Sequence, residues 1–496
     1  MCGIAVSIGN DERSFIETSL ATMTYRGPDD SGLFRQSGVS LGHRRLSIID
    51  VSGGKQPILN EAGDAAIVLN GEIYNFKSLR AELEQRFRFT THTDTEVLLH
   101  LYEELGPACL DRISGMFAFA IVNKGRVFLA RDRIGIKPLY MGTFEGQTCF
   151  ASELKCLRGC TDLREFPPGH FYTHDGGFVR YYDLPTRQPY SLSLEESFVR
   201  VRDLVREAVE RRLVADVPVG VFLSGGLDSS IIAAVMRSHH DQLHSFAVGM
   251  EGSPDLAAAR EVAQFLSTTH HEYVYTREEM ESILPEVIYH LESFDAPLVR
   301  SSIPGFLVSR LAQPFVKVIL TGEGSDELFS GYHYLKSITD SEKLFSELVR
   351  ITSGLHNTNL QRTDRMTMAH SLEARVPFLD PEVVEFAFSL PVTIRQASGD
   401  GIEKWFLRKA YEGMLPDGIV WRTKQKFSEG AGSSGVMESV ADQAISDRDF
   451  SEARAKAPVE IRSKEEFYYY RLFREHFPDL PPHLVGRTKD YTPSPR

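Results

Sequence analysis

A short polar loop between a buried strand and a helix sets the strongest limit on what this chain can fold into. The run VPVGVFL (217–223) is almost entirely apolar, SGGLDSS (224–230) follows it, and IIAAVM (231–236) has the apolar residues of a helix. A strand that is apolar on both faces is typical of a parallel sheet covered by helices. Similar runs follow at LHSFAVGM (243–250) and VKVIL (316–320). The sequence therefore predicts a parallel α/β domain here.

The first third of the chain has a different pattern. The runs AAIVLNGEIYN (65–75), GMFAFAIVN (115–123) and RVFLARDRIG (126–135) are short, and Gly, Asn and Asp interrupt them. Such runs are typical of antiparallel strands. Apolar residues spaced i, i+3 and i+4 predict two helices, within 76–87 and 93–105. We expect an antiparallel α+β domain in this region.

The stretch DLPTRQPYSLSLEES (183–197) separates the two patterns and is rich in Pro and Ser. A chain of 496 residues is too long for one ordinary core. We therefore expect two domains, residues 1–185 and residues 195–496. The chain is expected to be mainly helical from about residue 340. Its tail from Pro478 is rich in Pro and polar residues, which predicts loose order.

Charge and composition exclude several kinds of partner. The net charge of -13 argues against nucleic acid or an anionic membrane as the main partner, because both demand a basic face. No apolar run approaches the ~20 residues of a transmembrane helix. The start of the chain lacks the basic and apolar regions of a signal peptide. Five cysteines are few and odd in number, which indicates a reducing compartment. We expect a cytoplasmic protein.

SGGLDSS is the most specific candidate site. Its backbone N–H groups and the following helix N-terminus favour an anion at one point. Gly225 and Gly226 allow close approach of the backbone, and the hydroxyls of Ser224 and Ser229 add donors. It is not a Walker A loop, which needs a lysine, and Asp228 fits a phosphate site only with Mg²⁺ between them. The alternative, a purely structural turn, explains the glycines but not the whole string.

A second acidic loop, TGEGSDELFSGY (321–332), follows the apolar run VKVIL. It places Glu323, Asp326 and Glu327 near a helix start, where acidic residues also complement the helix dipole. In an open α/β sheet, ligands bind at the carboxyl ends of the strands. Our hypothesis is that the two loops supply one carboxylate each, Asp228 and Asp326, to one Mg²⁺ ion.

The position of Cys2 suggests a second kind of chemistry. Removal of Met1 would leave a thiol and a free α-amine on one residue. A thiol of reference pKa ~8.5 can be deprotonated near neutral pH by an α-amine of ~7.7–8.0. Taken alone, Cys2 is equally well explained as an accident of the N-terminus. GHRRLSI (42–48), NGEIYN (70–75) and THTDTE (91–96) fit binding loops, although Asn-Gly is above all a turn signal.

Together these strings resemble the glutamine-dependent asparagine synthetase family whose glutaminase half is an N-terminal-nucleophile domain. The order of the family motifs is kept along nearly the whole chain: MCGI, YRGPDDSG, GHRRLSI, NGEIYN, GMFAFAI, RDRIGIKPLY, SELK, GVFLSGGLDSS, SFAVGM, GSPDL, TGEGSDE, LEARVPFLD and WRTKQKFSEG. The resemblance implies an N-terminal αββα antiparallel β-sandwich of the Ntn hydrolase type. It also implies a C-terminal parallel α/β domain of the pyrophosphatase, or adenine nucleotide alpha hydrolase, type with helical additions.

For the first domain, the resemblance implies a glutaminase. Cys2 looks like its nucleophile, and Asn70 with Gly71 matches the oxyanion hole. Seven further positions match residues that hold glutamine: Arg45 for its carboxylate, the backbone at Leu46, Ser47, Ile48 and Ile49, and Glu72 and Asp94 for its α-ammonium. The thioester on Cys2 would be hydrolysed, and ammonia would pass through a tunnel to the second domain.

For the second domain, the resemblance implies that ATP activates a carboxylate as its acyl-adenylate, after which ammonia forms the amide. Glu323 matches a residue near the adenylate and is a candidate base toward ammonia. Lys424 matches a lysine facing pyrophosphate, and Asp228 and Asp326 are the expected Mg²⁺ ligands. The positions matched to the nucleotide and its pyrophosphate are Leu223, Ser224, Gly225, Gly226, Asp228, Ser229, Val248, Thr321 and Gly322.

The acceptor end departs from the family pattern. Members with the GEGSDE loop commonly read D-x-T-T-x-R-A-S, where this chain reads DAPLVRSS (295–302). Arg300, a candidate acceptor ligand, is kept, but Pro297 and Leu298 replace hydroxyl residues that help shape the aspartate pocket. Asn359 falls where related enzymes can have Asp. Loss of hydroxyl donors would weaken a polar aspartate site and admit a different acid.

The leading prediction is a glutamine-hydrolysing, ATP-dependent carbon–nitrogen ligase of the asparagine synthase type. Its expected substrates are glutamine, ATP and aspartate, with Mg²⁺ as the metal. One alternative is the amidation of another carboxylic acid in a specialised pathway. Another is a glutaminase whose second domain only binds nucleotide as a regulatory module. A cyclase like β-lactam synthetase is disfavoured, because it has no use for Cys2. We expect no nucleic acid and no membrane partner, and leave a homodimer open.

Overall fold

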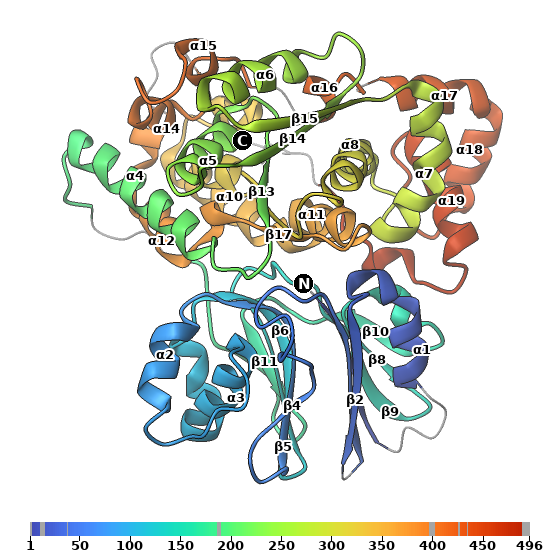
Figure 1. The fold of residues 1–496 in the computed structure, drawn as a ribbon. Coiled ribbons are helices and arrows are strands. Elements are labelled where there is room, and N and C mark those ends of the chain that lie inside the picture. The colour runs from blue at the N-terminus through green and yellow to red at the C-terminus, as the bar shows by residue number, and fades with distance from the viewer. Residues whose placement is uncertain are drawn as a thin grey trace.

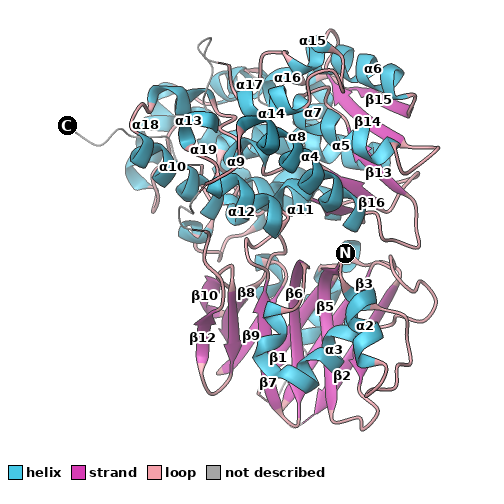
Figure 2. Cartoon of the chain, turned by 90° about the vertical axis from the view of Figure 1, so that its left-hand side faces the viewer, coloured by secondary structure: helices cyan, strands magenta, loops and turns pink. Residues whose placement is uncertain are grey.

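The computed structural model describes residues 2–9, 15–36, 38–185, 190–395, 402–424, 427–433 and 435–488. Antiparallel sheets form the lower part of the molecule in Figure 1, and a parallel sheet wrapped in helices forms the upper part. The view turned by 90° in Figure 2 shows the same division. Within the described residues, no helix has the length and apolar character that crossing a membrane requires.

The described part of the chain forms two six-stranded antiparallel sheets in its first third. The first sheet, in the order β10-β8-β9-β1-β3-β2, contains β1 (Gly3–Ile8), β2 (Asp30–Gln36), β3 (Val39–Arg45), β8 (Tyr140–Phe144), β9 (Gln147–Ala151) and β10 (Thr161–Glu165). The second sheet, in the order β12-β11-β7-β6-β5-β4, contains β4 (Ile58–Leu59), β5 (Ala65–Ile73), β6 (Gly115–Asn123), β7 (Arg126–Arg131), β11 (His170–Thr173) and β12 (Gly177–Arg180).

These two sheets pack face to face between helices. Successive side chains of a strand point to opposite faces, so one face of each sheet supplies apolar residues such as Ile4, Leu41 and Val68 to a shared core. Helix α1 (Phe15–Thr22) covers the outer face of the first sheet, and α2 (Phe76–Leu83) and α3 (Asp94–Leu105) cover the second. The αββα sandwich was predicted and is confirmed. Helix α2 is shorter than the expected 76–87.

The described residues after 190 form a five-stranded parallel sheet in the order β15-β14-β13-β16-β17. Its strands are β13 (Val219–Phe222), β14 (His244–Gly249), β15 (Thr269–Val274), β16 (Val318–Leu320) and β17 (Glu373–Arg375). The parallel α/β fold was predicted and is confirmed, whereas β17 was not expected. Because β13 and β16 are adjacent and parallel, the loops 224–230 and 321–332 leave the sheet at the same edge.

Helices surround this sheet and form most of the chain beyond residue 340, as predicted. Side chains cap two of their N-termini: Ser193 forms a capping box with Glu196, and Ser253 accepts a bond from the Leu256 N–H, with Pro254 in the first turn. The described helices are α4 (Leu194–Arg211), α5 (Leu227–Arg237), α6 (Pro254–Leu266), α7 (Arg277–Leu291), α8 (Ala296–Ala312), α9 (Ser325–Leu328), α10 (Ser341–Ser353), α11 (Asn359–Met368), α12 (Pro381–Ser389), α13 (Val392–Arg395), α14 (Trp405–Ala410), α15 (Asp417–Val420), α16 (Phe427–Gly430), α17 (Val436–Ala444), α18 (Asp447–Lys456) and α19 (Lys464–His476).

A buried ionic network joins the two parts of the molecule. The Arg26 guanidinium lies 2.7 Å from Glu153 and 2.8 Å from Asp364, and Arg365 lies 2.9 Å from Glu153. Arg26 and Glu153 belong to the antiparallel part, and the other two residues belong to α11. All four side chains are at most 3% exposed. Buried charges are costly unless they are paired, so this network fixes how the two parts meet.

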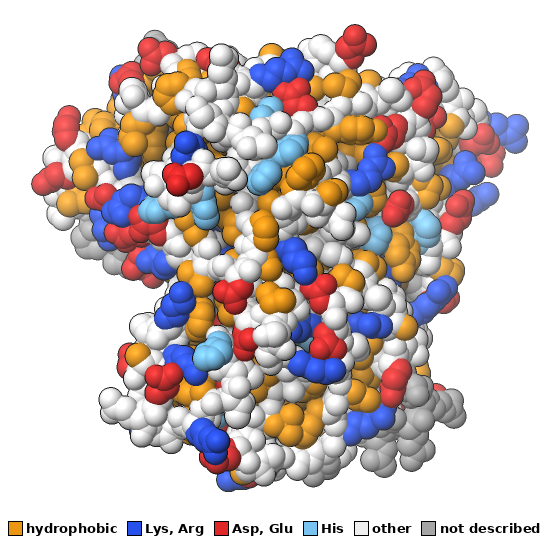
Figure 3. All heavy atoms as spheres, in the orientation of Figure 1, with side chains coloured by type: hydrophobic (Ala, Val, Ile, Leu, Met, Phe, Trp, Pro, Cys, Tyr) orange, Lys and Arg blue, Asp and Glu red, His pale blue; other side chains and the backbone are white. Residues whose placement is uncertain are grey.

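The surface has mixed charge. On the face shown in Figure 3, Lys and Arg side chains are interspersed with Asp and Glu. This face is therefore unlike the basic surface that binding to nucleic acid requires.

Candidate active sites

Cys2 lies directly before β1, at the junction of the two parts of the molecule. Its Sγ is 3.9 Å from the Leu46 carbonyl oxygen, and its backbone nitrogen donates to Asn70 Oδ1 at 3.1 Å. The side chain is 6% exposed, and burial raises the pKa of the thiol. A base close to this thiol would therefore help to form the thiolate.

Asn70 and Gly71 lie on β5 beside the nucleophile. The buried Nδ2 of Asn70 has no hydrogen-bond partner among the described residues. A Cβ on Gly71 would lie 2.0 Å from the Met116 carbonyl oxygen, so the close approach of β5 to β6 requires glycine here. The site thus has a free amide donor next to Cys2, as an oxyanion hole would need.

Arg45 ends β3, and the chain that follows holds its guanidinium. The group donates to the carbonyls of Ile49 at 3.2 Å, Asp50 at 2.7 Å and Val51 at 3.1 Å. These bonds orient a buried cation without neutralising it, which suits it to a carboxylate ligand.

The segment between Arg45 and Ile49 has some of its backbone groups already bound. The N–H of Ser47 donates to Asp29 at 2.8 Å, and the carbonyl of Ile48 accepts from the Asp216 N–H at 2.9 Å. The carbonyl of Leu46 faces the Cys2 thiol.

Three carboxylates interact near Cys2. Asp94 accepts a bond from the Ile73 N–H at 2.8 Å; burial, with the charge of Glu373, raises its pKa to about 6. Burial and the charges of Glu373 and Asp94 raise the pKa of Glu72 well above its usual range. Arg375 lies 3.5 Å from Glu72 and offsets part of this repulsion. A ligand ammonium placed here would be stabilised by the surplus negative charge.

The loop SGGLDSS connects β13 to α5. Gly225 has a left-handed φ of 69°, and a Cβ there would lie 2.5 Å from backbone atoms of Ala258 and Ala259. The Ser224 and Ser229 hydroxyls lie 3.2 Å apart. The Ser229 hydroxyl also donates to the Gly226 carbonyl at 3.1 Å. The first turn of α5, whose N–H groups have no partner within the helix, therefore begins beside two hydroxyls.

The two acidic loops meet at the sheet edge. Lys404 Nζ lies 2.5 Å from Asp228 Oδ2 and 2.6 Å from Asp326 Oδ1. A Cβ on Gly322 would lie 2.6 Å from the Asp228 Cβ, so this contact requires glycine. Lys424 lies 2.8 Å from Asp326 Oδ2. Although burial opposes it, the two lysines hold the pKa of Asp326 below its usual range.

Asp228 and Asp326 both contact the ammonium group of Lys404, so their oxygens lie close enough together to share one cation. Mg²⁺ binds oxygen ligands, usually through one or two protein carboxylates together with substrate phosphates. No cluster of three or more His, Cys, Asp or Glu that could hold a metal occurs among the described residues. The donor set therefore fits Mg²⁺ that arrives with a polyphosphate, rather than an all-protein metal site.

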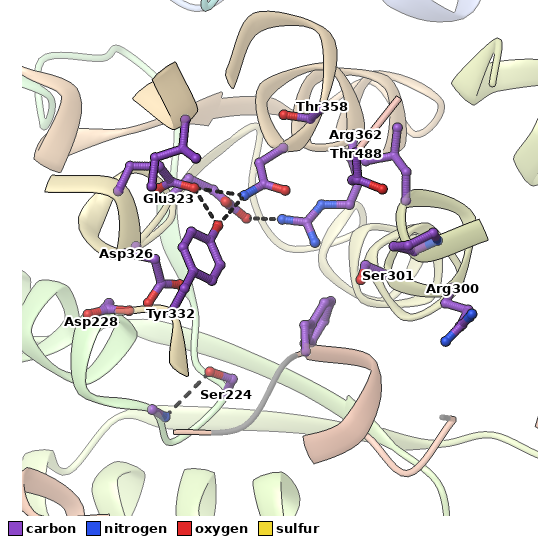
Figure 4. A pocket seen from close by; sticks show the side chains of 18 of the residues that line it. Ser224, Asp228, Arg300, Ser301, Glu323, Asp326, Tyr332, Thr358, Arg362 and Thr488 are labelled. Atoms are coloured by element: carbon purple, nitrogen blue, oxygen red, sulfur yellow. Dashed lines mark hydrogen bonds and ion pairs between the residues drawn. The ribbon is translucent and has the colours of Figure 1, made fainter. Parts of the chain in front are cut away.

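A cavity of about 1490 Å³ extends from these loops to the start of α8. Glu323 forms an ion pair with Arg362 of α11 inside it. Glu327 accepts hydrogen bonds from Tyr332 and, at 3.2 Å, from Asn359. Burial and the charge of Asp326 raise the pKa of Glu327 to about 7. Figure 4 shows Ser224 and Asp228 on one side of the cavity and Arg300 and Ser301 on the other.

Most predicted nucleotide positions line this cavity. The lining includes Leu223, Ser224, Gly226, Asp228, Ser229, Val248 and Gly322, while Thr321 instead lines a smaller neighbouring pocket of about 60 Å³. At the far end, Pro297 and Leu298 form part of the wall. Arg300 lies there as well, but Glu465 of α19 pairs with it at 2.8 and 2.9 Å. Its charge is therefore neutralised within the protein.

Two models of known protein families match this chain, one in each of its two parts. A family model described as a glutamine amidotransferase domain matches residues 1–169, and one described as asparagine synthase matches residues 200–350 and 337–491. The chain is 40% identical over 483 residues to asparagine synthetase B (glutamine-hydrolysing) of Escherichia coli (strain K12), covering 92% of this chain and 87% of that protein. The chain belongs to the asparagine synthase family.

A plant member of the asparagine synthase family gives a similar match. The chain is 40% identical over 508 residues to asparagine synthetase (glutamine-hydrolysing) 2 of Arabidopsis thaliana, covering 96% of this chain and 88% of that protein. Among solved structures, an allosteric regulatory enzyme of purine biosynthesis matches with a TM-score of 0.35 and 17% identity, over 55% of this chain and 80% of that one. That score is too low to support an argument.

Four site residues of this asparagine synthase family member were not predicted from the sequence. Lys404 bridges the two acidic loops, and Arg362 pairs with Glu323. Glu373 and Arg375 reach the Cys2 site from β17. Both residues belong to the family motif LEARVPFLD (372–380), but the place of this motif beside Cys2 depends on how the two parts of the molecule pack. The pattern of the sequence therefore held no direct signal for these roles.

Proposed function

We propose that this chain is a glutamine-hydrolysing asparagine synthetase, which transfers the amide nitrogen of glutamine to aspartate at the expense of ATP. The observation that carries the proposal is the match of both halves, over more than nine-tenths of the chain, to proteins named asparagine synthetase. The two arrays of polar side chains described above supply one reaction site for each half.

In the glutaminase half, removal of Met1 exposes the α-amine of Cys2, which takes the thiol proton. The thiolate attacks the side-chain carbonyl of glutamine, forming a C–S bond, and Asn70 Nδ2 donates to the developing oxyanion. The amide nitrogen leaves as ammonia with the proton returned from the α-amine. Water then hydrolyses the thioester to glutamate. Arg45 binds the glutamine carboxylate, and Asp94 with Glu72 receives its ammonium.

In the synthetase half, we assign the phosphates of ATP to the N-terminus of α5 and the hydroxyls of Ser224 and Ser229. A Mg²⁺ ion held by Asp228 and Asp326 would neutralise phosphate charge. The acceptor carboxylate attacks the α-phosphorus and pyrophosphate leaves, with Lys424 beside it to stabilise the charge. Glu323, held by Arg362, is the proposed proton acceptor when ammonia attacks the adenylate carbonyl.

Amidation of another acid is the second candidate function. It is favoured by Pro297 and Leu298 in the cavity wall and by the Arg300–Glu465 pair, which removes a free cation from the acceptor end. An acceptor-acid screen monitored by pyrophosphate release separates the two candidates. Aspartate is expected to give the highest kcat/KM, with one AMP and one asparagine formed per pyrophosphate.

Two outcomes of that screen would contradict the leading proposal. Preference for an acid other than aspartate would favour the second candidate. Glutamine hydrolysis without ATP cleavage, whatever acid is offered, would indicate a glutaminase with a regulatory nucleotide domain. A homodimer, which size-exclusion chromatography would test, stays a prediction, as does a cytoplasmic location.

A further inference from the structure

The last described segment of the chain lies in the wall of the active-site cavity. A short 3₁₀ helix, η7 (Pro482–Leu484), and the four residues after it follow α19, and residues 483–488 line the cavity together with Pro297, Leu298 and Ser301. Figure 4 shows Thr488 on the side of Ser301 and Arg300, across the cavity from Ser224 and Asp228. The segment therefore lies at the acceptor end and not at the phosphate end.

Thr488 is bound through its backbone and its side chain. Its N–H donates to Asp295 Oδ2 at 3.0 Å, and its hydroxyl lies 2.9 and 3.0 Å from the two oxygens of the same carboxylate. Its carbonyl accepts from Arg462 at 2.7 Å, and Arg462 also pairs with Asp295. Asp295 is fully buried. Loose order was predicted for the tail from Pro478, and up to residue 488 that prediction is wrong.

The two residues before Thr488 are fixed as well. Arg487 lies 2.6 Å from Glu466, and its guanidinium is 5.4 Å from the centre of the Phe294 ring. A Cβ on Gly486 would lie 1.8 Å from the Asn357 carbonyl oxygen, so only glycine allows the segment to reach this depth. The segment is thus held from α19 on one side and lies against the turn before α11 on the other.

Asp295 connects this segment to the start of α8. It is the N-cap of α8, where its Oδ1 accepts from the Leu298 N–H at 3.1 Å. One carboxylate therefore sets both the turn that carries Pro297 and Leu298 and the position of Thr488. Arg300, one helical turn further along, is fixed by Glu465. Movement of Thr488 would change the width and polarity of the acceptor end.

We propose that residues 483–488 form a specificity wall for the acceptor, with Thr488 as a positioning residue acting through Asp295. This inference rests on the proposed function and names the acceptor class as a short amino dicarboxylic acid. The wall limits the length of the acceptor, so that aspartate fits and its longer homologue glutamate does not.

The test compares Thr488→Val, which removes the hydroxyl at nearly constant volume, with Thr488→Ser, which keeps it. Gly486→Val displaces the segment by collision with Asn357. A matched control is Thr22→Val, whose hydroxyl bonds only to its own helix at Thr18 on the other part of the molecule. Each variant is assayed for pyrophosphate release with ammonium as the nitrogen source, and its Tm is measured.

Thr488→Val is expected to raise the KM for aspartate by up to about tenfold, because loss of the hydroxyl bond to Asp295, worth about 1 kcal/mol, allows the wall to shift. The kcat at saturating aspartate, the KM for ATP and the glutaminase rate should stay within about twofold of the parent. Thr488→Ser should restore the KM for aspartate. Thr488→Val should also lower the preference for aspartate over glutamate, and Gly486→Val should lower it more. The control Thr22→Val should change none of these values.

Two results would overturn the inference. In the first, both Thr488→Val and Gly486→Val keep the parent KM for aspartate and the parent preference over glutamate. In the second, every kinetic constant falls together with the Tm and Thr488→Ser restores nothing, which would show a structural role alone. If the parent protein releases no pyrophosphate with any acid, the proposed function fails instead, so the two failures are distinguishable.

Discussion

At the scale of single residues, the position of Cys2 accounts for its assignment as nucleophile. Its nitrogen lies 3.1 Å from Asn70 Oδ1, and the same side chain has a free Nδ2 for an oxyanion. Cys2→Ala should reduce glutamine-dependent synthesis by about three orders of magnitude or more. Ammonium should still support synthesis at close to the parent rate, because the synthetase cavity does not include Cys2. Loss of both activities in a variant of unchanged Tm would contradict separate sites.

Asp94 should give glutamine binding a characteristic pH dependence. With its pKa raised to about 6, the carboxylate is charged above that pH and becomes protonated below it. The KM for glutamine should therefore rise as the pH falls from 7 to 5, approaching tenfold per pH unit below the pKa.

The matched variant for this prediction is Asp94→Asn. It should have a high KM for glutamine that no longer depends on pH in this range, because the titrating group is absent. A KM that rises equally in parent and variant would assign the pH dependence to another group.

At the scale of elements, the turn between β13 and α5 depends on Gly225. An alanine there would adopt a left-handed φ, which costs ~1–2 kcal/mol, and its Cβ would meet the backbone of α6 at 2.5 Å. Gly225→Ala should therefore raise the KM for ATP at least about tenfold and leave the glutaminase rate unchanged.

Gly63 provides a control with the same backbone strain and no collision. It also has a positive φ, of 69°, but a Cβ there would meet no atom within 4 Å. Gly63→Ala should change stability by about 1 kcal/mol and leave the KM for ATP unchanged. If the two substitutions changed the KM for ATP equally, the close packing at Gly225 would be unimportant for ATP binding.

Elements with local signals could be predicted from the sequence. Ser253 and Pro254 mark the start of α6, and short apolar runs interrupted by Gly and Asn mark β5 and β6, because caps and strands depend on near neighbours. To predict that Asp228 and Asp326 lie close together, one rule beyond the local pattern was needed: the carboxyl ends of neighbouring parallel strands lie at the same edge of the sheet.

Other elements could not be predicted in this way. Strand β17 has three residues, two of them charged, so it has neither an apolar run nor a clear alternation. The segment that ends at Thr488 has a composition typical of loose chain, and its order comes from Asp295, far away in the sequence. In both cases tertiary contacts override the local preference.

At the scale of the whole molecule, the buried network between the two parts should dominate stability at their junction. Asp364 pairs with Arg26 at 2.8 Å, and both are nearly inaccessible to solvent. Asp364→Ala should lower the free energy of unfolding by about 3–5 kcal/mol, because a buried guanidinium loses a counter-charge. Thermal and denaturant unfolding measure this loss.

The exposed pair Arg448–Glu452 is the control for this prediction. Their side chains are 86% and 54% exposed, so Glu452→Ala should change stability by less than ~1 kcal/mol. Equal small losses in both variants would show that the junction does not depend on the buried pair.

The most direct test of a two-site synthetase is to follow the nitrogen atom. The parent protein is given ATP, Mg²⁺, aspartate, glutamine labelled with ¹⁵N in its amide, and unlabelled ammonium, and asparagine is analysed by mass spectrometry. We predict ¹⁵N in the asparagine amide, with AMP formed in equal amount, and only unlabelled asparagine from Cys2→Ala. Hydrolysis of labelled glutamine while the parent forms only unlabelled asparagine, or none, would contradict the account.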